Sequence, residues 1–215
     1  RLVEISASLK KEFGISVTTL CFDVQKKEAV DAAFKTLEKT TIDILVNNAG
    51  LALGREAFDE ADMNDWETMM QTNVNGLLYV TRAALPFLKK SAAPHIVNLG
   101  SIAGKEVYEF GNVYCASKFA VDAISRSMRI DLLKHGIKVT AIHPGAVETE
   151  FALVRFKGNK EKAGNTYKGL VPLTPDDIAD TIFYCCNLPP HVCINDLVIT
   201  CLQQAGTYYF YKNGS

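Results

Sequence analysis

The sequence has almost no net charge and no long apolar run. Its 215 residues include 23 Lys and Arg and 24 Asp and Glu, a formal charge of −1 at pH 7 with His neutral, and the basic residues form no block. Without a basic patch, nucleic acid or an anionic membrane surface would not be attracted. The longest apolar runs have the length of a strand, whereas a helix that crosses a bilayer needs about 20 apolar residues. We therefore expect neither nucleic acid nor a membrane as a partner.

The six cysteines lack the C-x-x-C spacing that is typical of metal sites. Several of them lie within apolar runs, where a free cysteine behaves as a small apolar side chain. Reduced thiols of this kind are typical of cytosolic proteins. The sequence therefore predicts no metal site and a cytoplasmic location.

What the sequence does contain is a regular alternation of strands and helices. The chain has 48% hydrophobic and 22% charged residues and is long enough for one globular domain with a full core. Near-continuous apolar strands that alternate with helices favour a parallel sheet covered on both faces, an α/β fold. The expected strands are 16–22, 42–46, 95–101, 137–142 and 192–201. The expected helices are 1–13, 25–39, 65–90 with a break at Gly76, 113–135 and 175–187.

Ser101, Tyr114 and Lys118 form the pattern with the clearest chemical meaning. Ser101 ends the apolar run that begins at His95, so its hydroxyl would lie at the carboxyl end of a strand, where open parallel sheets bind ligands. Tyr114 and Lys118 are four residues apart and would share one face of a helix. A cation beside a phenol lowers the tyrosine pKa from about 10. Such a tyrosine can exchange a proton with a substrate oxygen near neutral pH.

A Tyr-x-x-x-Lys pair alone is a weak signal. Tyr208 and Lys212 repeat the spacing near the end of the chain, with Asn195 thirteen residues before Tyr208 where Ser101 precedes Tyr114. His143, at the end of the 137–142 strand, invites a catalytic interpretation, but we interpret it as structural.

Further motifs surround Ser101, Tyr114 and Lys118. The segment 47–50 reads Asn-Asn-Ala-Gly and follows a strand, and the segment 144–149 reads Pro-Gly-Ala-Val-Glu-Thr and follows another. With these motifs in this order, the chain resembles the short-chain dehydrogenase/reductase family over essentially its whole length. The resemblance implies a doubly wound Rossmann-type sheet in a single domain, residues 1–215. It also implies reversible hydride transfer between a nicotinamide cofactor and a carbinol/carbonyl pair.

In this family the catalytic residues are four, and the resemblance assigns them to Asn73, Ser101, Tyr114 and Lys118. Tyr114 would give or take the proton, and Lys118 would lower the Tyr114 pKa and hold the nicotinamide ribose. Ser101 would hydrogen-bond the substrate oxygen, and Asn73 would hold a water that relays protons to Lys118.

The resemblance also implies a cofactor pocket that small and polar residues line after the strands. Two of its segments have simpler interpretations: Asp23 as a helix N-cap, and 47–50 as an ordinary Asn/Gly turn. The implied cofactor residues are Asp23, Val24, Asn48, Ala49, Gly50, Tyr114, Lys118, Pro144, Gly145, Val147 and Thr149.

Within the family, the chain is most similar to NADP-dependent 3-hydroxy acid dehydrogenases that act on serine, allo-threonine and related compounds. Arg155 lies between apolar residues and would turn toward the pocket, where its guanidinium could bind a substrate carboxylate beside Ser101 and Tyr114. The alternative for Arg155 is a surface position or a salt bridge to Glu148 or Glu150. Alternatives for the function are a 3-oxoacyl or other carbonyl reductase, and a non-catalytic dinucleotide-binding sensor or scaffold.

Three expectations concern the periphery. Residues 146–170 would form a lid over the substrate, and 202–215 a docked or flexible tail. The helices 65–90 and 113–135 carry more apolar surface than one sheet face needs, and the resemblance implies that such helices pair across subunits, so we expect a homotetramer or a dimer.

The family begins with a strand, a Gly-rich phosphate loop, a helix and a second strand, and none of these precedes Arg1. We therefore expect the chain to be part of a longer protein, because the strand at 16–22 would otherwise have no neighbour. The missing second strand ends in the residue that would choose the cofactor, so we expect NADP without excluding NAD.

Overall fold

The computed structural model describes residues 1–212, so the last three residues of the expected tail lie outside the described part. Its centre is a parallel sheet of four strands: β1 (Ile44–Asn47), β2 (His95–Leu99), β3 (Lys138–Pro144) and β4 (Asp196–Ile199), in the order β1-β2-β3-β4. Val46 pairs with Val97, and Val97 pairs with Thr140. The predicted α/β class and the parallel sheet are confirmed.

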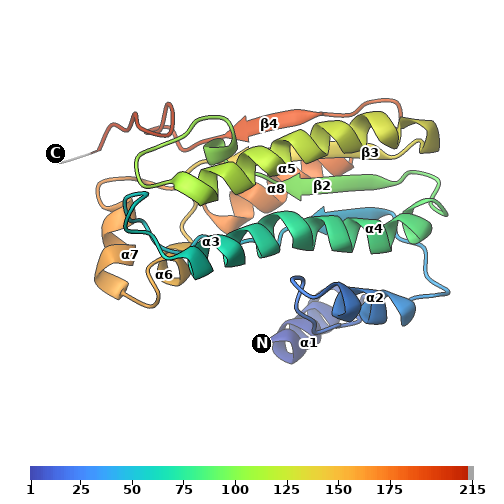
Figure 1. The fold of residues 1–215 in the computed structure, drawn as a ribbon. Helices are drawn as coiled ribbons and strands as arrows, with labels where there is room; N and C mark the ends of the chain where they lie inside the picture. The colour runs from blue at the N-terminus through green and yellow to red at the C-terminus, as the bar shows by residue number, and fades with distance from the viewer. Residues whose placement is uncertain (213–215) are drawn as a thin grey trace.

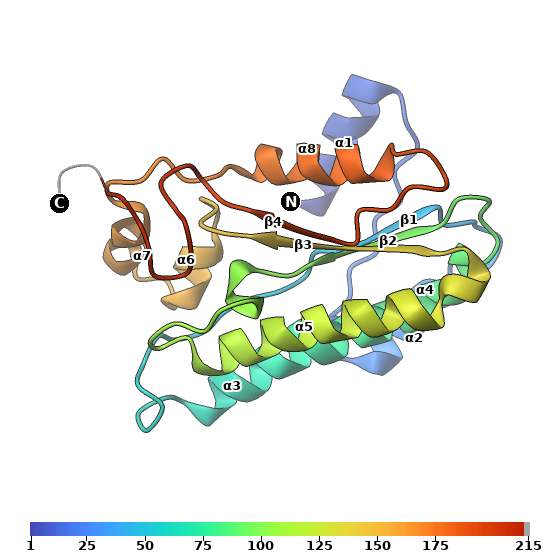
Figure 2. The same ribbon diagram turned by 90° about the horizontal axis from the view of Figure 1, so that it is seen from above.

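Helices cover both faces of this sheet (Figures 1 and 2). On one face lie α3 (Met63–Met70), α4 (Leu77–Leu88) and α5 (Asn112–Asp131), with α2 (Lys27–Lys35) against α4. On the other face lies α8 (Pro175–Cys186), which begins with Thr174 as its N-cap in a full capping box. The short helices α6 (Phe151–Arg155) and α7 (Lys160–Tyr167) lie beyond the carboxyl ends of the strands (Figure 1).

The core lies between the sheet and α4, where apolar side chains of strands and helix meet beside one buried polar contact, from Asn47 of β1 to Thr81 of α4. Leu88 of α4, Ile96 of β2 and Val139 of β3 are all fully buried there, together with Val30 of α2. Burying a side chain of this size stabilises the fold by ~1.5–3 kcal/mol. A second cluster, which includes Tyr114, Cys115 and Met69, packs beneath the carboxyl ends of the strands.

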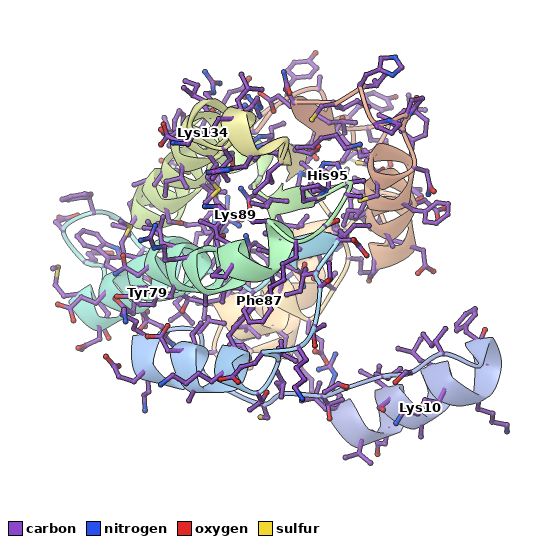
Figure 3. All side chains as sticks on the ribbon, turned by 90° about the vertical axis from the view of Figure 1, so that its right-hand side faces the viewer. Lys10, Tyr79, Phe87, Lys89, His95 and Lys134 are labelled. Atoms are coloured by element: carbon purple, nitrogen blue, oxygen red, sulfur yellow. The ribbon has the colours of Figure 1, made fainter. Side chains whose placement is uncertain are left out.

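The N-terminal region differs from the prediction. Residues 16–22 form no strand; the segment is an extended connection, because a strand needs a neighbour for its backbone hydrogen bonds. Helix α1 (Leu2–Phe13) forms as predicted and ends at Gly14 in the left-handed conformation, but it has no buried residue. Figure 3 shows it, marked by Lys10, standing apart from the rest of the molecule. Among the described helices, none is long and apolar enough to cross a membrane.

Candidate active site

A pocket of about 950 Å³ opens where the carboxyl ends of β1, β2 and β3 meet α6, α7 and α8. The strand ends contribute Asn48, Gly100 and Pro144, and α5 contributes Tyr114 and Lys118. This is the place where open parallel sheets bind ligands. The pocket therefore joins three of the four predicted catalytic residues, Ser101, Tyr114 and Lys118, to the predicted cofactor segments, whereas Asn73 is not part of its lining.

Ser101 is fixed by the close approach of its segment to α5. It follows β2 and starts a short 3₁₀-helix (Ile102–Gly104), and its Oγ accepts a hydrogen bond from the Ala103 amide at 3.1 Å. A Cβ on Gly104 would lie 2.5 Å from the Lys118 carbonyl oxygen. Only a residue without a side chain allows this contact, which brings Ser101 against the helix of Tyr114.

Lys118 is buried, with 7% of its surface exposed. Its Nζ donates a hydrogen bond to the Leu99 carbonyl oxygen at 3.0 Å. Burial lowers the pKa of Lys118 to about 8, because a charged group loses its hydration there. An ammonium with such a pKa can lose a proton near neutral pH.

The predicted lowering of the Tyr114 pKa by Lys118 is wrong for this structure. Burial is the largest effect and raises the pKa of Tyr114 well above its ordinary value, while a hydrogen bond with Ser101 and the Arg155 guanidinium oppose it. The Lys118 ammonium is turned to the Leu99 carbonyl. At neutral pH the Tyr114 phenol is therefore protonated and is a proton donor.

Asn73 lies in a π-helical turn (Gln71–Gly76) that replaces the predicted break between α3 and α4. Its side chain is buried and holds the segment after the Asn-Asn-Ala-Gly motif: Oδ1 accepts from the Leu51 amide, and Nδ2 donates to the Leu51 carbonyl, both at 2.8 Å. Nδ2 also lies 3.0 Å from Ser117 Oγ. A Cβ on Gly50 would lie 3.2 Å from Asn73 Oδ1 and 3.5 Å from Lys118 Nζ, so the two side chains face the same backbone.

Arg155 turns inward, so the alternatives of a surface position or a salt bridge are wrong. It is 9% exposed, and its Nε donates to the Gly54 carbonyl at 3.0 Å while Nη1 donates to Tyr108 Oη at 2.8 Å. The guanidinium carbon lies 5.5 Å from the centre of the Tyr114 ring. Glu150 pairs with Arg1 instead, at 2.7 Å.

Of the other residues predicted to bind a cofactor, most line the pocket but three do not. Ala49 is exposed outside the lining. Asp23 accepts a hydrogen bond from the Gln25 amide at 2.9 Å and is not a helix cap, because α2 begins only at Lys27. Val24 lies against Gly76. The residues that do line the pocket are Asn48, Gly50, Pro144, Gly145, Val147 and Thr149.

Three residues that line or support the pocket were not predicted from the sequence. Tyr108 holds Arg155, and the Phe151 ring lies 5.6 Å from the Tyr114 ring. Gln204, in the tail, accepts a hydrogen bond from the Ala146 amide at 2.8 Å, so the tail is docked against the 144–149 segment. These contacts join residues far apart in the sequence, and no local pattern marks them.

The fold and the site are those of a dinucleotide-dependent oxidoreductase. The family model for short chain dehydrogenases matches residues 1–160, and the chain belongs to that family. It is 45% identical to an NADP-dependent 3-hydroxy acid dehydrogenase, YdfG, of Salmonella typhi over 201 residues, 92% of this chain and 81% of that protein. It is 42% identical over 207 residues to a serine 3-dehydrogenase of Agrobacterium fabrum, with 95% and 83% covered.

A solved structure of the closed form of serine dehydrogenase complexed with NADP+ superposes on this chain with a TM-score of 0.88. The two are 44% identical, and the match covers 94% of this chain and 83% of that one.

Proposed function

We propose that this chain is an NADP-dependent dehydrogenase of small 3-hydroxy acids such as serine or allo-threonine. The observation that carries the substrate class is the buried Arg155 guanidinium in the pocket, next to the Tyr114 ring. The relatives named above support the choice of NADP over NAD.

The residues at the strand ends fit a nicotinamide cofactor, which supplies the hydride chemistry when it is bound. Gly50 and Gly145 leave the backbone open to the pocket. The Lys118 ammonium has three hydrogens, and in the described chain one hydrogen bond is seen, to Leu99. Lys118 would hold the ribose with the others, beside Asn48.

Tyr114 would protonate the carbonyl oxygen in reduction and take the proton back in oxidation. Its raised pKa keeps the phenol protonated in this structure, which suits the reductive direction. Lys118, with a pKa of about 8, can exchange protons near neutral pH. Asn73 would hold a water that resupplies this proton, through the lone pair of Oδ1 that Leu51 does not use.

Ser101 and Arg155 would orient the substrate around Tyr114. Ser101 would donate to the oxygen at the reacting carbon as its charge develops. A guanidinium has five N–H donors, and Gly54 and Tyr108 receive two from Arg155. The remaining donors suit a carboxylate two carbons from the reacting carbinol.

The alternatives share the catalytic residues, so they are separated by other features. A 3-oxoacyl or other carbonyl reductase does not need a buried arginine for a carboxylate. A non-catalytic sensor or scaffold does not need both Tyr114 and Lys118. The inward position of Arg155 favours the hydroxy acid.

The test compares two arginines of the same pocket. Arg155→Met should raise KM for serine or allo-threonine by about 10- to 100-fold, on the order of 1.5–3 kcal/mol for a charged hydrogen bond. An uncharged alcohol of similar size should be affected little. Arg55, which also lines the pocket and lies 5.9 Å from the Tyr108 ring, provides the matched control as Arg55→Met. Equal losses with both substrates, or none, would remove Arg155 and the carboxylate from the proposal.

The lid of residues 146–170 is part of the proposal. Tyr167 Oη donates to the Val147 carbonyl at 2.8 Å, and Lys157 Nζ lies 2.8 Å from Asp65 of α3. The Tyr167 contact lies within the lid. Lys157 and Arg155, which donates to Gly54 and Tyr108, connect the lid to the rest of the chain, so we expect these contacts to break when α6 and α7 separate to admit the substrate.

We also propose a homotetramer in the cytoplasm. Two surfaces with exposed apolar residues could contact other subunits. One comprises Phe119 and Ile130 of α5 with Leu78 of α4, and the other comprises Phe183 of α8 with Val198 of β4. Two different surfaces with two-fold symmetry produce a tetramer. The six free cysteines would stay reduced in the cytoplasm. Light scattering at micromolar concentration would give the mass of the assembly, and a monomer would contradict it.

A further inference from the structure

Behind Ser101, outside the pocket lining, four charged or titratable residues lie together. Asp122 and His143 are buried, whereas Lys105 is partly exposed and Asp196 is exposed. Lys105 follows the 3₁₀-helix of Ser101, Asp122 belongs to α5, His143 to β3 and Asp196 to β4. Lys105 Nζ is 3.0 Å from Asp122 Oδ1 and 2.6 Å from Asp196 Oδ2. We call these four residues the Ser101 support cluster.

His143 connects this cluster to Ser101. Its side chain is fully buried, and Nδ1 lies 3.2 Å from the Ser101 carbonyl oxygen. A carbonyl oxygen only accepts hydrogen bonds, so Nδ1 carries the proton in this contact. A Cβ on Gly100 would lie 2.4 Å from Nδ1, so a residue without a side chain at position 100 is needed for the ring to come this close.

The other ring nitrogen faces the two carboxylates. Nε2 lies 2.9 Å from Asp196 Oδ1 and 3.7 Å from Asp122 Oδ1, yet within the described chain it has no partner in hydrogen-bonding geometry. The facing charges are the two carboxylates, the Lys105 ammonium and the Arg126 guanidinium, which pairs with Asp122 at 2.8 Å.

The cluster is an ion-pair network and not a vacant metal site. Three possible ligand atoms do lie within 4.8 Å of one another, one each from Asp122, His143 and Asp196. The Lys105 ammonium, however, already lies between the two carboxylates and neutralises them. A cation would have to displace it.

The segment 101–105 is therefore held at both ends by one cluster. His143 holds the carbonyl of Ser101, and the two aspartates hold the side chain of Lys105. Between them, Gly104 packs on the backbone of Lys118. The position of the Ser101 hydroxyl relative to Tyr114 follows from these three contacts.

We propose that His143 is a positioning residue for Ser101, which acts through its Nδ1–H on the Ser101 carbonyl. It does not touch the substrate. The inference rests on the dehydrogenase reaction but not on the carboxylate of the substrate, so it can be tested with any carbonyl that the enzyme reduces. If the Arg155 variant disproved the carboxylate substrate, the inference about His143 would not be affected.

The test uses two amides that replace different halves of the ring. In His143→Asn the side-chain NH₂ can take the place of Nδ1–H and donate to Ser101, whereas in His143→Gln it reaches toward the place of Nε2. We expect His143→Asn to keep kcat within about threefold and His143→Gln to lose about tenfold or more, because a displacement of about 1 Å can cost on the order of 100-fold in rate. The dissociation constant of NADPH should be unchanged in both. Equal losses in the two variants would overturn the proposal.

A double-mutant cycle separates positioning from general damage. In a Ser101→Ala background, His143→Gln should cause no further loss of kcat, since the group that it positions is gone. An additive loss would overturn the proposal. If His143→Gln does not fold, Lys105→Met tests the other end of the segment in the same cycle. Its control is Lys27→Met, which breaks the exposed ion pair with Asp31. No loss for Lys105→Met, or an additive one, would likewise overturn it.

Discussion

The two ends of the sheet differ in the kind of side chain that they bury. At the amino ends of the strands, the core around Ile96 and Val139 is apolar, and on the opposite face of the sheet the buried His95 and Thr140 are hydrogen-bonded to each other. At the carboxyl ends, Tyr114, Lys118 and Arg155 are all at least nine-tenths buried. Burying polar groups costs free energy unless they find partners, so one end stabilises the fold while the other keeps groups ready for a ligand.

The largest effect should come from the carboxyl end, and on activity alone. Tyr114→Phe should abolish turnover, to below a few per cent, with cofactor binding near normal, because only the proton donor is removed. Lys118→Met should damage both turnover and cofactor binding. Kinetics and NADPH titration of the purified variants measure the two quantities. Substantial turnover in Tyr114→Phe would contradict the assignment of the donor.

The next effect should come from the amino end, and on stability alone. Leu88→Ala would leave a cavity in the fully buried cluster of Ile96 and Val139. We expect a loss of about 2–5 kcal/mol in the free energy of unfolding, with the KM of the remaining folded enzyme unchanged. Urea denaturation gives the first quantity and initial rates the second. A changed KM would show that the two ends are not independent.

At the amino end, His95 should make the stability of the fold depend on pH. Its Nε2 lies 2.7 Å from Thr140 Oγ1, which itself donates to the Ile194 carbonyl, so Nε2 carries the ring proton. Burial lowers the pKa of His95 to about 4, against about 6.5 in an unfolded chain. The unfolded state therefore binds a proton more readily, and stability that is present above pH 6.5 is lost as the pH falls toward 4.

The size of this effect should be up to about 3 kcal/mol, at about 1.4 kcal/mol per pKa unit. Comparing unfolding free energies at pH 7 and pH 5 would detect it. His95→Gln keeps a donor for Thr140 but does not titrate, so its stability should change less over the same interval. The same slope in the variant would assign the acid sensitivity to other groups.

The smallest effect should come from the surface of the lid. Lys157 is 57% exposed where it pairs with Asp65, and exposed pairs contribute about 0–1 kcal/mol. We expect Lys157→Met to shift the melting temperature by no more than a few degrees. A larger shift, measured by calorimetry, would mean that the lid is part of the stable core.

The grouping of Ser101, Tyr114 and Lys118 at one pocket could be predicted from the sequence because it depends on local geometry; Asn73 was assigned only through the resemblance to the family. Tyr114 and Lys118 share a helical face, and Ser101 ends a strand. The prediction of a strand at 16–22 was wrong. A β-branched composition indicates that residues prefer a strand, but it does not show that a neighbouring strand is present to pair with.

The remaining contacts depend on how distant segments meet. Arg155 reaches Tyr108 across 47 positions, and His143 reaches Ser101 across 42. The effect of Lys118 on Tyr114 was also predicted wrongly, because helical spacing says that two side chains share a face and not that burial outweighs their interaction. No periodicity carries such information.

The π-helical turn at Gln71–Gly76 has a consequence for how this chain can change length. A π-helix has one residue more per hydrogen-bonded ring than an α-helix. Deleting one residue there would restore an unbroken α-helix and nearly keep the rotation of α3 relative to α4, because the π-turn holds its extra residue as a local bulge. A deletion in the regular part of either helix would instead rotate one end against the other by about 100°, the step of one residue, and Met69 would leave the cluster under the site. A deletion inside Gln71–Gly76 should mainly displace Asn73 from Leu51. In a library of single-codon deletions across residues 63–88, we therefore expect folded protein to survive best inside these six positions, with activity lost there as elsewhere.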